Sequence, residues 1–420
     1  MYPLTLTQHN RRMDIPGASA VLLALAAAVF ATGAQGQSVT VTDTTEAAKV
    51  AQWVRDLPPV SNAKNHFSAI SIVDMVALGP TGTSEVRNNG PESFYQNTSA
   101  VNSAKQDITQ HLDTLGPILQ AGGINVARNV QNFPWGMIET SKGNYQFSIA
   151  DTIVSKLQTY GIDYVGTVMP YASWDLASKG AAASVCTHFF SEDFPYLAKA
   201  GKMDRYVDLS AFIAQLNTLV ERYDGDGTAD MSGLKQPLTY WQIHNEPEGA
   251  DCGGFRNDVA SFFELMKQSY TTIKATCPSC QVMNGGAGLT DTTKQGGTFW
   301  KDYGLLGGGN YLDIIAVHYN EGKHEPATDT VELFEQRIAA LKQWLGDKPI
   351  WVTEFGVVIG QDGQQLGNFT AKTETDAAAW FIRYYAAGLA QGVKRFFSDR
   401  QSFVNVSGTS SGYLRYLPYY

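Results

Sequence analysis

Basic side chains are the scarcer charged residues in this sequence. Its 420 residues include 31 Lys and Arg against 40 Asp and Glu, which gives a formal net charge of −9. Nucleic-acid binding needs clustered cations that neutralise phosphates, so we expect no nucleic-acid partner. Charged residues make up only 17% of the chain and hydrophobic residues 44%. A large core can therefore form, and a mainly disordered chain is excluded.

The sequence also lacks a hydrophobic run long enough to cross a bilayer. The apolar run Val21–Phe30 falls short of the ~20 residues that a span needs. It follows a weakly basic stretch and precedes the small residues 31–36, which is typical of a secretory signal peptide. We predict that residues 1–36 are such a peptide and that the mature protein is secreted or periplasmic, without a membrane partner. An N-terminal membrane anchor is the alternative.

Cysteine is rare, with four residues at Cys186, Cys252, Cys277 and Cys280. An exported chain can hold disulfides, and four cysteines allow three connectivities. We expect bonds Cys186–Cys252 and Cys277–Cys280. For the second pair, two free thiols or half of a metal site are the alternatives.

Motifs for nucleotide phosphates and for zinc are missing. No GxxxxGK[ST] occurs, and Gly79-Pro-Thr-Gly82 does not match GxGxxG. The seven histidines form no HExxH or HxH pattern. A nucleotide-binding protein and a zinc hydrolase are therefore disfavoured, and we expect no cofactor.

What the sequence does contain is a regular alternation of short apolar stretches and amphipathic helices. Apolar stretches of this kind are typical of strands covered on both faces. The predicted strands are Phe67–Ala77, Ile124–Val130, Ile162–Met169, Leu238–His244, Gln281–Asn284, Asp313–Tyr319, Ile350–Phe355 and Val393–Ser398.

Between these strands, apolar residues recur at spacings of three and four, which places them on one helix face. The predicted helices include stripes that start at Ile108, Phe212, Phe262 and Phe334. Eight strands separated by helices predict an α/β fold, a single (β/α)8 TIM barrel. The rival is a doubly wound open sheet, which usually carries a glycine-rich phosphate loop after its first strand.

The two ends of the chain depart from a regular barrel. Only 22 residues follow Ser398, and they include Pro418, so the last helix is expected to be atypical or missing. An apolar helical stripe, Ala47 to Leu57, lies in an N-terminal helical segment at 37–64. We predict that this segment covers the gap and that residues 65–420 form the catalytic domain.

Two glutamates stand at the ends of predicted strands. Asn245-Glu246-Pro247 ends the fourth strand, and Glu354-Phe355-Gly356 ends the seventh. Because the carboxyl ends of barrel strands surround the catalytic mouth, Glu246 and Glu354 are expected to face each other. Paired carboxylates that flank one bond are what glycoside hydrolysis requires. The alternatives are that Asn245 caps a helix with Glu246 in its first turn, and that Glu354 is a rim ion-pair partner.

These motifs resemble the signatures of glycoside hydrolase clan A. The stretch Phe133-Pro-Trp-Gly-Met-Ile-Glu139, with Gly143-Asn-Tyr-Gln-Phe147 and Asp151, resembles the second-strand region of its families 39 and 42. Family 5 is similar in style, and the resemblance covers about residues 65 to 400. It implies a retaining glycosidase in which Glu246 is the general acid/base and Glu354 the nucleophile. It further implies that Asn245 hydrogen-bonds the 2-hydroxyl group of the sugar.

The resemblance also implies supporting residues. Arg128, at the end of the second strand, would lie near the nucleophile and keep Glu354 ionised. His318 and Tyr319, at the end of the sixth strand, would touch the nucleophile or the sugar. Ordinary structural contacts are the alternative for all three. His244 precedes Asn245 and points the other way by strand alternation, so we interpret it as a core residue.

Aromatic residues near predicted loops are candidates for binding sugar rings. Trp135, Tyr171, Trp174 and Trp300 follow predicted strands or lie near them, and such rings stack on the apolar faces of sugars. Packing of the loops themselves is the alternative. Trp241 and Trp351 lie inside strands and are expected in the core.

The sequence departs from the clan at the eighth strand, where many members place a tryptophan under the sugar. Here Phe396-Phe397-Ser-Asp399-Arg400 offers none. Phe397, Asp399 or Arg400 is expected to take that place.

One acidic turn resembles the beginning of a calcium loop. Asp224, Asp226 and Asp230 offer oxygen ligands at nearby positions, but the usual glycine offset and the distal glutamate are missing. A structural calcium ion is a hypothesis here, and a plain acidic turn is the alternative.

Together these observations predict a secreted retaining glycosidase that cleaves a β-glycosidic bond in a polysaccharide or oligosaccharide. Resemblance to family 39 favours a xylosidase-like or exopolysaccharide-cleaving activity. A non-catalytic carbohydrate-binding barrel and a transglycosylase are the alternatives. The sequence leaves the sugar, endo or exo action and the oligomeric state open.

Overall fold

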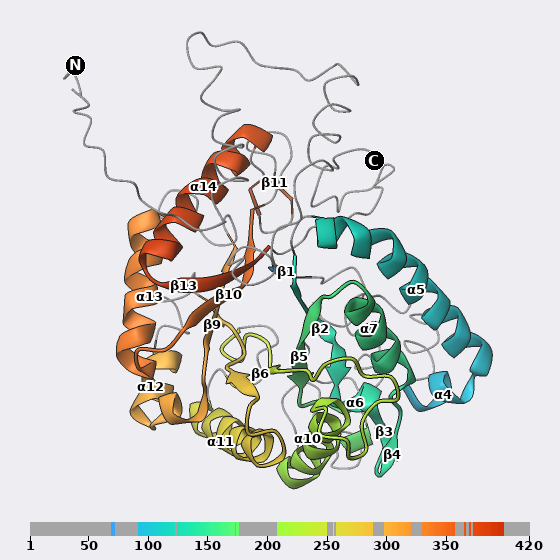
Figure 1. Cartoon of the computed structure of the whole chain (residues 1–420). Coiled ribbons are helices and arrows are strands. Elements are labelled where there is room, and N and C mark those ends of the chain that lie inside the picture. The colour runs from blue at the N-terminus through green and yellow to red at the C-terminus, as the bar shows by residue number, and fades with distance from the viewer. Residues whose placement is uncertain are drawn as a thin grey trace, which may run out of the picture. The chain divides into compact units, whose positions relative to one another are not determined.

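A sheet of nine strands, all paired in parallel, forms the centre of the described fold (Figure 1). The strands in order of pairing are β7 (Gln281–Met283), β6 (Tyr240–Ile243), β5 (Asp163–Met169), β2 (Val126–Pro134), β1 (Ala69–Ser71), β13 (Val393–Ser398), β10 (Ile350–Gly356), β9 (Ile315–Asn320) and β8 (Ala287–Gly288). The strands at the two ends of this order, β7 and β8, are separated in the chain by residues 284–286 alone. Met283 in β7 also forms a parallel bridge with Ile314, which directly precedes β9.

The computed structural model describes a defined part of the chain, all within the unit Phe67–Tyr420. The described residues are 69–71, 91–121, 124–172, 174–175, 208–249, 255, 258–288, 298–320, 330–357, 365–366, 369–370 and 373–398. The predicted signal peptide, the helical segment 37–64, the bond Cys186–Cys252 and the chain after Ser398 lie outside them.

Helices connect the strands and lie outside them in Figure 1. The longer helices are α5 (Thr98–Ala121), α7 (Ser148–Thr159), α10 (Leu209–Tyr223), α11 (Val259–Thr276), α13 (Val331–Leu345) and α14 (Glu374–Ala390). Short elements are α4 (Pro91–Gln96), α6 (Trp135–Ile138), α12 (Phe299–Leu305), the 3-10 turn η2 (Gly308–Tyr311), and the hairpins β3–β4 (Glu139–Ser141, Asn144–Tyr145) and β11–β12 (Gln365–Leu366, Phe369–Thr370). Among the described residues, no helix combines the length and the apolar character that a membrane crossing requires.

Capping side chains explain where several of these helices begin. Asp208 accepts a hydrogen bond from the amide of Ala211 at the start of α10, and Asp258 accepts one from Ser261 at the start of α11. A carboxylate at this position satisfies amides that have no partner within the helix. These two aspartates therefore determine where α10 and α11 begin.

Strand alternation divides the apolar residues into two cores. Residues on one side of the strands form an inner core, and those on the other side pack against the helices in a larger outer core. The inner core consists of Val126, Val165, Met283, Ile314, Ala316, Trp351 and Phe397, with Tyr240 packed against it. Successive residues therefore point to opposite sides, as Val126 and Ala127 do in β2.

The predicted strands are confirmed, because each of the eight overlaps a strand of this parallel sheet. The predicted helical stripes fall in α5, α10, α11 and α13. Trp241 and Trp351 are buried, as expected for strand interiors. The fold is therefore α/β with a parallel sheet and helical connections.

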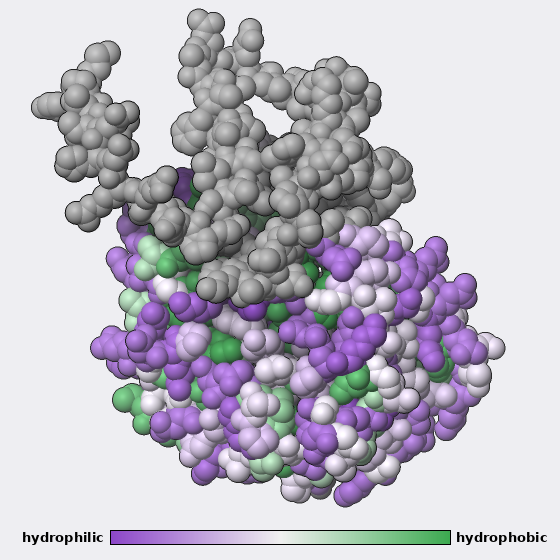
Figure 2. Space-filling view, viewed as in Figure 1, coloured by the Kyte–Doolittle hydropathy of each residue, from purple (hydrophilic) through white to green (hydrophobic). Residues whose placement is uncertain are grey.

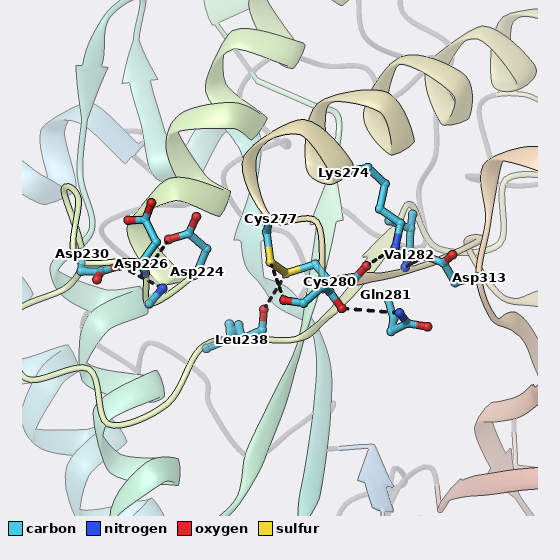
Figure 3. The surroundings of a disulfide bond; sticks show 12 residues. Asp224, Asp226, Asp230, Leu238, Lys274, Cys277, Cys280, Gln281, Val282 and Asp313 are labelled. Carbon is cyan, nitrogen blue, oxygen red and sulfur yellow. Dashed lines mark hydrogen bonds and ion pairs between the residues drawn. A yellow bond between two sulfur atoms is a disulfide. The ribbon is translucent and has the colours of Figure 1, made fainter.

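Cys277 and Cys280 form a disulfide between the end of α11 and the start of β7, with Cα atoms 5.3 Å apart (Figure 3). This confirms the second predicted bond. Lys274 and Asp313 form an ion pair of 2.9 Å beside it. The connection into β7 is thus anchored by a covalent link and by an ion pair.

The described surface visible in Figure 2 is mainly hydrophilic, with hydrophobic residues scattered over it. Leu305, Leu306 and Leu389 are the large hydrophobic residues that the described surface exposes. A few exposed hydrophobic side chains are normal on the surface of a folded protein.

Candidate active site

Strand alternation places Arg128 on the inner side of the sheet, two residues after Val126 of the inner core. The guanidinium group is fully buried and donates to four groups. It donates to Glu354 Oε1 at 3.1 Å and to the Thr353 carbonyl at 3.3 Å, and also to Asn245 Oδ1 at 2.7 Å and to Gln242 Oε1. A buried cation requires such compensation, and the planar fork of arginine can supply several donors at once. Arg128 therefore joins β2 to the ends of β6 and β10. Its contact with Glu354 agrees with what the family resemblance implied.

A β-bulge in β10 decides which way Glu354 points. Val352 pairs with Val317 of β9, but the next pair is Glu354 with His318, so Thr353 is an extra residue in β10. Thr353 instead donates its hydroxyl to the Val317 carbonyl at 3.3 Å. A bulge of this kind re-aims the side chain that follows it. As a result, Glu354 and His318 lie side by side.

His318 connects the two predicted catalytic carboxylates. Its Nδ1 atom lies 2.9 Å from Glu246 Oε1 and 3.5 Å from Glu354 Oε2. One carboxylate oxygen from each glutamate and a His318 ring nitrogen all lie within 4.8 Å of one another. The Glu246 side chain is 28% exposed and that of Glu354 11%. The structure therefore brings together Glu246, Glu354, His318, Asn245 and Arg128.

The turn that carries Glu246 has an unusual backbone. His244 and Glu246 have φ values of 75° and 45°, in the left-handed region that non-glycine residues avoid. The Glu246 amide donates to the Gly285 carbonyl at 2.6 Å, and its carbonyl accepts from Gly249 at 2.9 Å. The alternative that Glu246 begins a helix is wrong, because a turn follows β6. Backbone strain of this kind is typical of functional sites.

Two glycines after β7 allow the backbone there to pack closely against this turn and against His318. A Cβ atom on Gly285 would lie 2.9 Å from Pro247 Cδ, and one on Gly286 would lie 2.1 Å from His318 Nε2. Gly286 also has φ +79°, which suits glycine. Neither glycine was predicted from the sequence as part of the site, although the pair Gly285-Gly286 directly after a predicted strand was a signal.

His244 is a core residue, as predicted. It is fully buried, and its Nε2 atom lies 2.6 Å from the Tyr171 hydroxyl. Burial lowers the pKa of His244 to about 3, so the ring is neutral. Its Nδ1 atom accepts from the Asn245 amide at 2.7 Å. The ring thereby supports the turn that holds Asn245.

Tyr319 corrects a prediction, because it does not face the carboxylates. As the neighbour of His318 it points to the outer side, where its ring stacks on Trp380 and packs against Phe334. Its hydroxyl donates to the Tyr384 hydroxyl at 3.2 Å. Strand alternation is the physical reason, since adjacent residues of β9 face opposite sides of the sheet.

The predicted sugar-stacking rings also differ from expectation. Trp135, Tyr171 and Trp300 are at most 4% exposed, so their faces pack against protein. Trp135 packs edge-on against Trp174, which is partly buried and donates to the Glu139 carbonyl at 2.7 Å. Of the four rings, Trp174 therefore keeps the most exposure for a ligand.

The eighth strand gives a similar correction for Phe397. It belongs to the inner core, where its ring packs against Trp351 with centroids 5.7 Å apart. A ring in that place cannot replace the missing tryptophan platform. Asp399 and Arg400 lie outside the described residues.

Glu248 is a buried carboxyl that the sequence analysis missed. It is 4% exposed, and its Oε1 atom accepts from the Gly288 amide at 2.6 Å and from Trp300 Nε1 at 2.9 Å. Burial is the main cause that raises the pKa of Glu248 to about 7. The signal was the second glutamate in Asn245-Glu-Pro-Glu248.

The acidic turn after α10 brings carboxylate oxygens of Asp224, Asp226 and Asp230 within 4.8 Å of one another (Figure 3). Asp230 accepts from the amides of Gly225 and Gly227, at 3.1 and 2.8 Å. Burial raises the pKa of Asp224, and the hydrogen bond that it accepts from the Asp226 amide acts in the opposite direction. Oxygen donors suit calcium, but the turn already closes on its own amides. Calcium binding there stays a prediction.

Comparison with known proteins supports the class that this geometry indicates. Residues 226–387, less than half of the chain, match the family model described as glycosyl hydrolase catalytic core. This segment contains both glutamates, and the match confirms the resemblance to glycoside hydrolases. No curated protein sequence matches the chain.

Solved glycosidase structures resemble the fold more distantly. A family 39 β-xylosidase from Caulobacter crescentus has 14% identity and TM-score 0.48, and the match covers 81% of this chain and 64% of that one. A complex of a xylanase mutant of Thermoanaerobacterium saccharolyticum with xylotriose has 12% identity and TM-score 0.49, covering 85% and 93%. A glucosidase from Croceicoccus marinus has 13% identity and TM-score 0.47, covering 69% of this chain and 55% of its own. The chain thus spans about half of that glucosidase. At TM-scores below 0.5, these likenesses carry no inference about activity.

Proposed function

We propose that the protein is a retaining glycosidase that cleaves a β-glycosidic bond in a polysaccharide or oligosaccharide. The observation that carries this proposal is the approach of Glu246 and Glu354, whose carboxylate oxygens lie within 4.8 Å of each other and share His318. Retaining enzymes hold their two carboxyl groups about 5–5.5 Å apart, whereas inverting enzymes need about 6.5–9.5 Å to seat a water. The short separation favours direct attack by one carboxylate.

The roles follow from the surroundings of each carboxylate. Glu354 forms a buried ion pair with the Arg128 guanidinium, so we assign Glu354 as the nucleophile. Glu246 is the more exposed of the two and lies against the His318 ring, which is a cation only when protonated, so it is the general acid/base. Asn245 is oriented by Arg128 and would bind the 2-hydroxyl group of the sugar.

The reaction runs in two displacements. In the first, Glu354 attacks the anomeric carbon while Glu246 gives its proton to the leaving oxygen, which forms a glycosyl ester and releases the leaving alcohol. In the second, Glu246 takes a proton from water, and the hydroxide oxygen attacks the same carbon. The ester bond breaks and Glu354 regains its carboxylate. These steps need no cofactor.

We further propose that the sheet closes into a (β/α)8 barrel. The consecutive strands β7 and β8 stand at opposite ends of the pairing order, and the Met283–Ile314 bridge joins the same two regions. The separate cluster of buried residues on one side of the strands supports closure. In such a barrel the carboxyl ends of β6 and β10 share one mouth. The last helix and the covering role of segment 37–64 stay predictions.

The substrate and the location are proposals of the same kind. Xylosidase-like or exopolysaccharide-cleaving action is favoured by the motif resemblance alone. Export through a signal peptide at residues 1–36 would place the enzyme where extracellular polysaccharides occur, and mass spectrometry of the mature N-terminus tests that step. A carbohydrate-binding barrel without activity and a transglycosylase remain as outcomes of the experiment below.

The test is a panel of nitrophenyl glycosides and β-linked polymers, with the anomeric form of the first product followed by NMR. We expect cleavage with retention, and partial rescue of a Glu354→Gly variant by azide with formation of a glycosyl azide. Binding without product would indicate a carbohydrate-binding barrel, and transfer to an added sugar in preference to water would indicate a transglycosylase. Product of inverted configuration would overturn the retaining mechanism.

A further inference from the structure

We propose that Glu248 is a positioning residue for the general acid/base, because its buried carboxyl ties the turn that carries Glu246 to β8 and α12. The inference rests on the proposed function and adds a residue to it. Glu248 is 4% exposed, and its Oε1 atom already accepts from two protein donors, so we assign it no contact with the sugar. It acts through Glu246, two residues before it.

The contacts of Glu248 reach two elements that follow the turn in the chain. Its Oε1 atom accepts from the Gly288 amide in β8 and from the Trp300 indole in α12. A Cβ atom on Gly288 would lie 3.3 Å from this oxygen, so glycine permits the close approach. Two donors on one buried oxygen hold the carboxyl in a single place. The turn is thereby fixed at its far end.

Backbone hydrogen bonds also hold the turn in place. The Glu246 amide donates to the Gly285 carbonyl, and the Gly249 amide donates to the Glu246 carbonyl. Because Glu246 has a left-handed φ of 45°, the turn stores strain that these contacts must offset. Without the tie at Glu248, the strained turn is expected to relax and to move the Glu246 carboxyl away from His318.

Charge couples the two glutamates as well. Glu246 is the charged group that acts on Glu248 among the described residues, and it raises the pKa of Glu248 further, after burial. The Gly288 amide and the Trp300 indole do not titrate and favour the charged form. Coupling of this kind is reciprocal, so ionised Glu248 favours a protonated Glu246. The second carboxyl oxygen, Oε2, has no hydrogen-bond partner in the described part of the chain.

The experiment compares two leaving groups on the sugar that the wild-type enzyme cleaves. A phenyl glycoside needs a proton from Glu246, whereas a dinitrophenyl glycoside leaves without one. We expect Glu248→Ala to lower kcat/KM for the phenyl glycoside by about 10- to 100-fold more than for the dinitrophenyl glycoside. Glu248→Asp, which keeps the charge but cannot reach both donors, should show the same pattern if the alanine variant fails to fold.

The variant Glu248→Gln keeps the hydrogen bonds to Gly288 and Trp300 but removes the negative charge of residue 248. Its amide oxygen can still accept from Gly288 and Trp300, so the rate on the phenyl glycoside should recover most of its value. Without this negative charge, the protonated form of Glu246 is less favoured, so Glu246 should lose its proton at lower pH. The alkaline limb of the pH–rate profile should therefore move to lower pH. This shift is a readout that a merely structural role would not produce.

A matched control is available at Glu139. This glutamate is also buried, and it accepts from the Trp135 indole at 2.6 Å and from the Gly143 amide at 2.7 Å. Glu139→Ala should reduce both rates equally or not at all. Equal losses on both glycosides for Glu248→Ala and Glu248→Asp would overturn the inference while the glycosidase assignment stands. A wild-type protein that cleaves no glycoside would overturn both.

Discussion

Arg128 of β2 and Glu354 of β10, 226 positions apart in the chain, form a buried ion pair with 3.1 Å between Nη1 and Oε1. The same guanidinium holds Asn245 at the end of β6. Arg128 therefore positions both Glu354, the proposed nucleophile, and Asn245, which we propose binds the sugar. A substitution that breaks this ion pair is therefore expected to affect both the stability of the fold and the activity of the site.

The first prediction concerns this pair. Arg128→Met should lower the free energy of unfolding by about 3–5 kcal/mol, because it leaves a buried carboxylate without its cation. It should also abolish most glycosidase activity. The half-exposed pair of Lys156 and Asp113 is the control, since Lys156→Met should cost no more than about 1 kcal/mol. Urea denaturation and kcat/KM measure both, and equal effects of the two substitutions would contradict the role of Arg128.

The second prediction concerns Gly286. Gly286→Ala would put a Cβ atom 2.1 Å from His318 Nε2 at a positive φ, so the ring must shift from its place beside the two carboxylates. Gly143 has nearly the same φ, +80°, but a Cβ atom added there would meet no atom within 4 Å. Gly143→Ala should therefore cost about 1–2 kcal/mol of backbone strain without loss of activity. Gly286→Ala should lower kcat as well.

These two alanine variants share their backbone strain and differ in the clash. Thermal unfolding and kinetics on the cleaved glycoside distinguish the two effects. If Gly286→Ala kept the wild-type kcat, the tight contact with His318 would have no part in positioning the carboxylates.

The third prediction is a pH dependence of stability at Glu248. Burial raises its pKa from 4.5 to about 7 in the folded state. Between these values the folded protein keeps the proton that the unfolded chain has released, so stability falls as pH rises. The resulting loss in the free energy of unfolding is on the order of 3 kcal/mol once the pH exceeds about 7. Below pH 4.5 it should be absent.

Glu248→Gln isolates this effect. The difference in unfolding free energy between wild type and variant, measured by denaturation from about pH 4 to 8, should change in favour of the variant as pH rises. A difference that stays constant over this range would show that the carboxyl binds its proton equally well in the folded and unfolded chain, and would contradict the raised pKa.

The fourth prediction distinguishes the roles of two neighbouring residues in β9, His318 and Tyr319. Tyr319→Phe removes a hydroxyl that bonds Tyr384 in the outer core, so it should cost about 1 kcal/mol of stability and leave kcat/KM nearly unchanged. His318→Ala removes the ring between the two carboxylates and should lower kcat strongly. A large loss of activity in a folded Tyr319→Phe variant would reinstate the tyrosine at the site.

Much of the fold was predictable because strand and helix periodicities are local properties. The apolar stretch at Ile350–Phe355 becomes β10, and the stripe at Phe334 becomes α13. The approach of Glu246 and Glu354 followed from their places at strand ends. Which side of β9 faced the site was also readable in principle, because His318 shares its side with Ala316 of the inner core.

Other features depended on contacts between distant segments. The extra residue Thr353 in β10 has no signal in local composition, and it alone brings Glu354 beside His318. Burial of Trp135 and of Glu248 likewise arises from packing between elements. Side chains near strand ends look alike in sequence whether they face the solvent or the core.

By itself, the sequence determined the order of strands and helices, and it placed Glu246 shortly after β6 and Glu354 near the end of β10, because side-chain periodicity and chain order are local properties. The tertiary structure decided the partners of those glutamates: Arg128 under Glu354, His318 between them and Glu248 behind the turn. These partners come from different strand ends and turns, and only the pairing of strands brings such distant residues within hydrogen-bond reach.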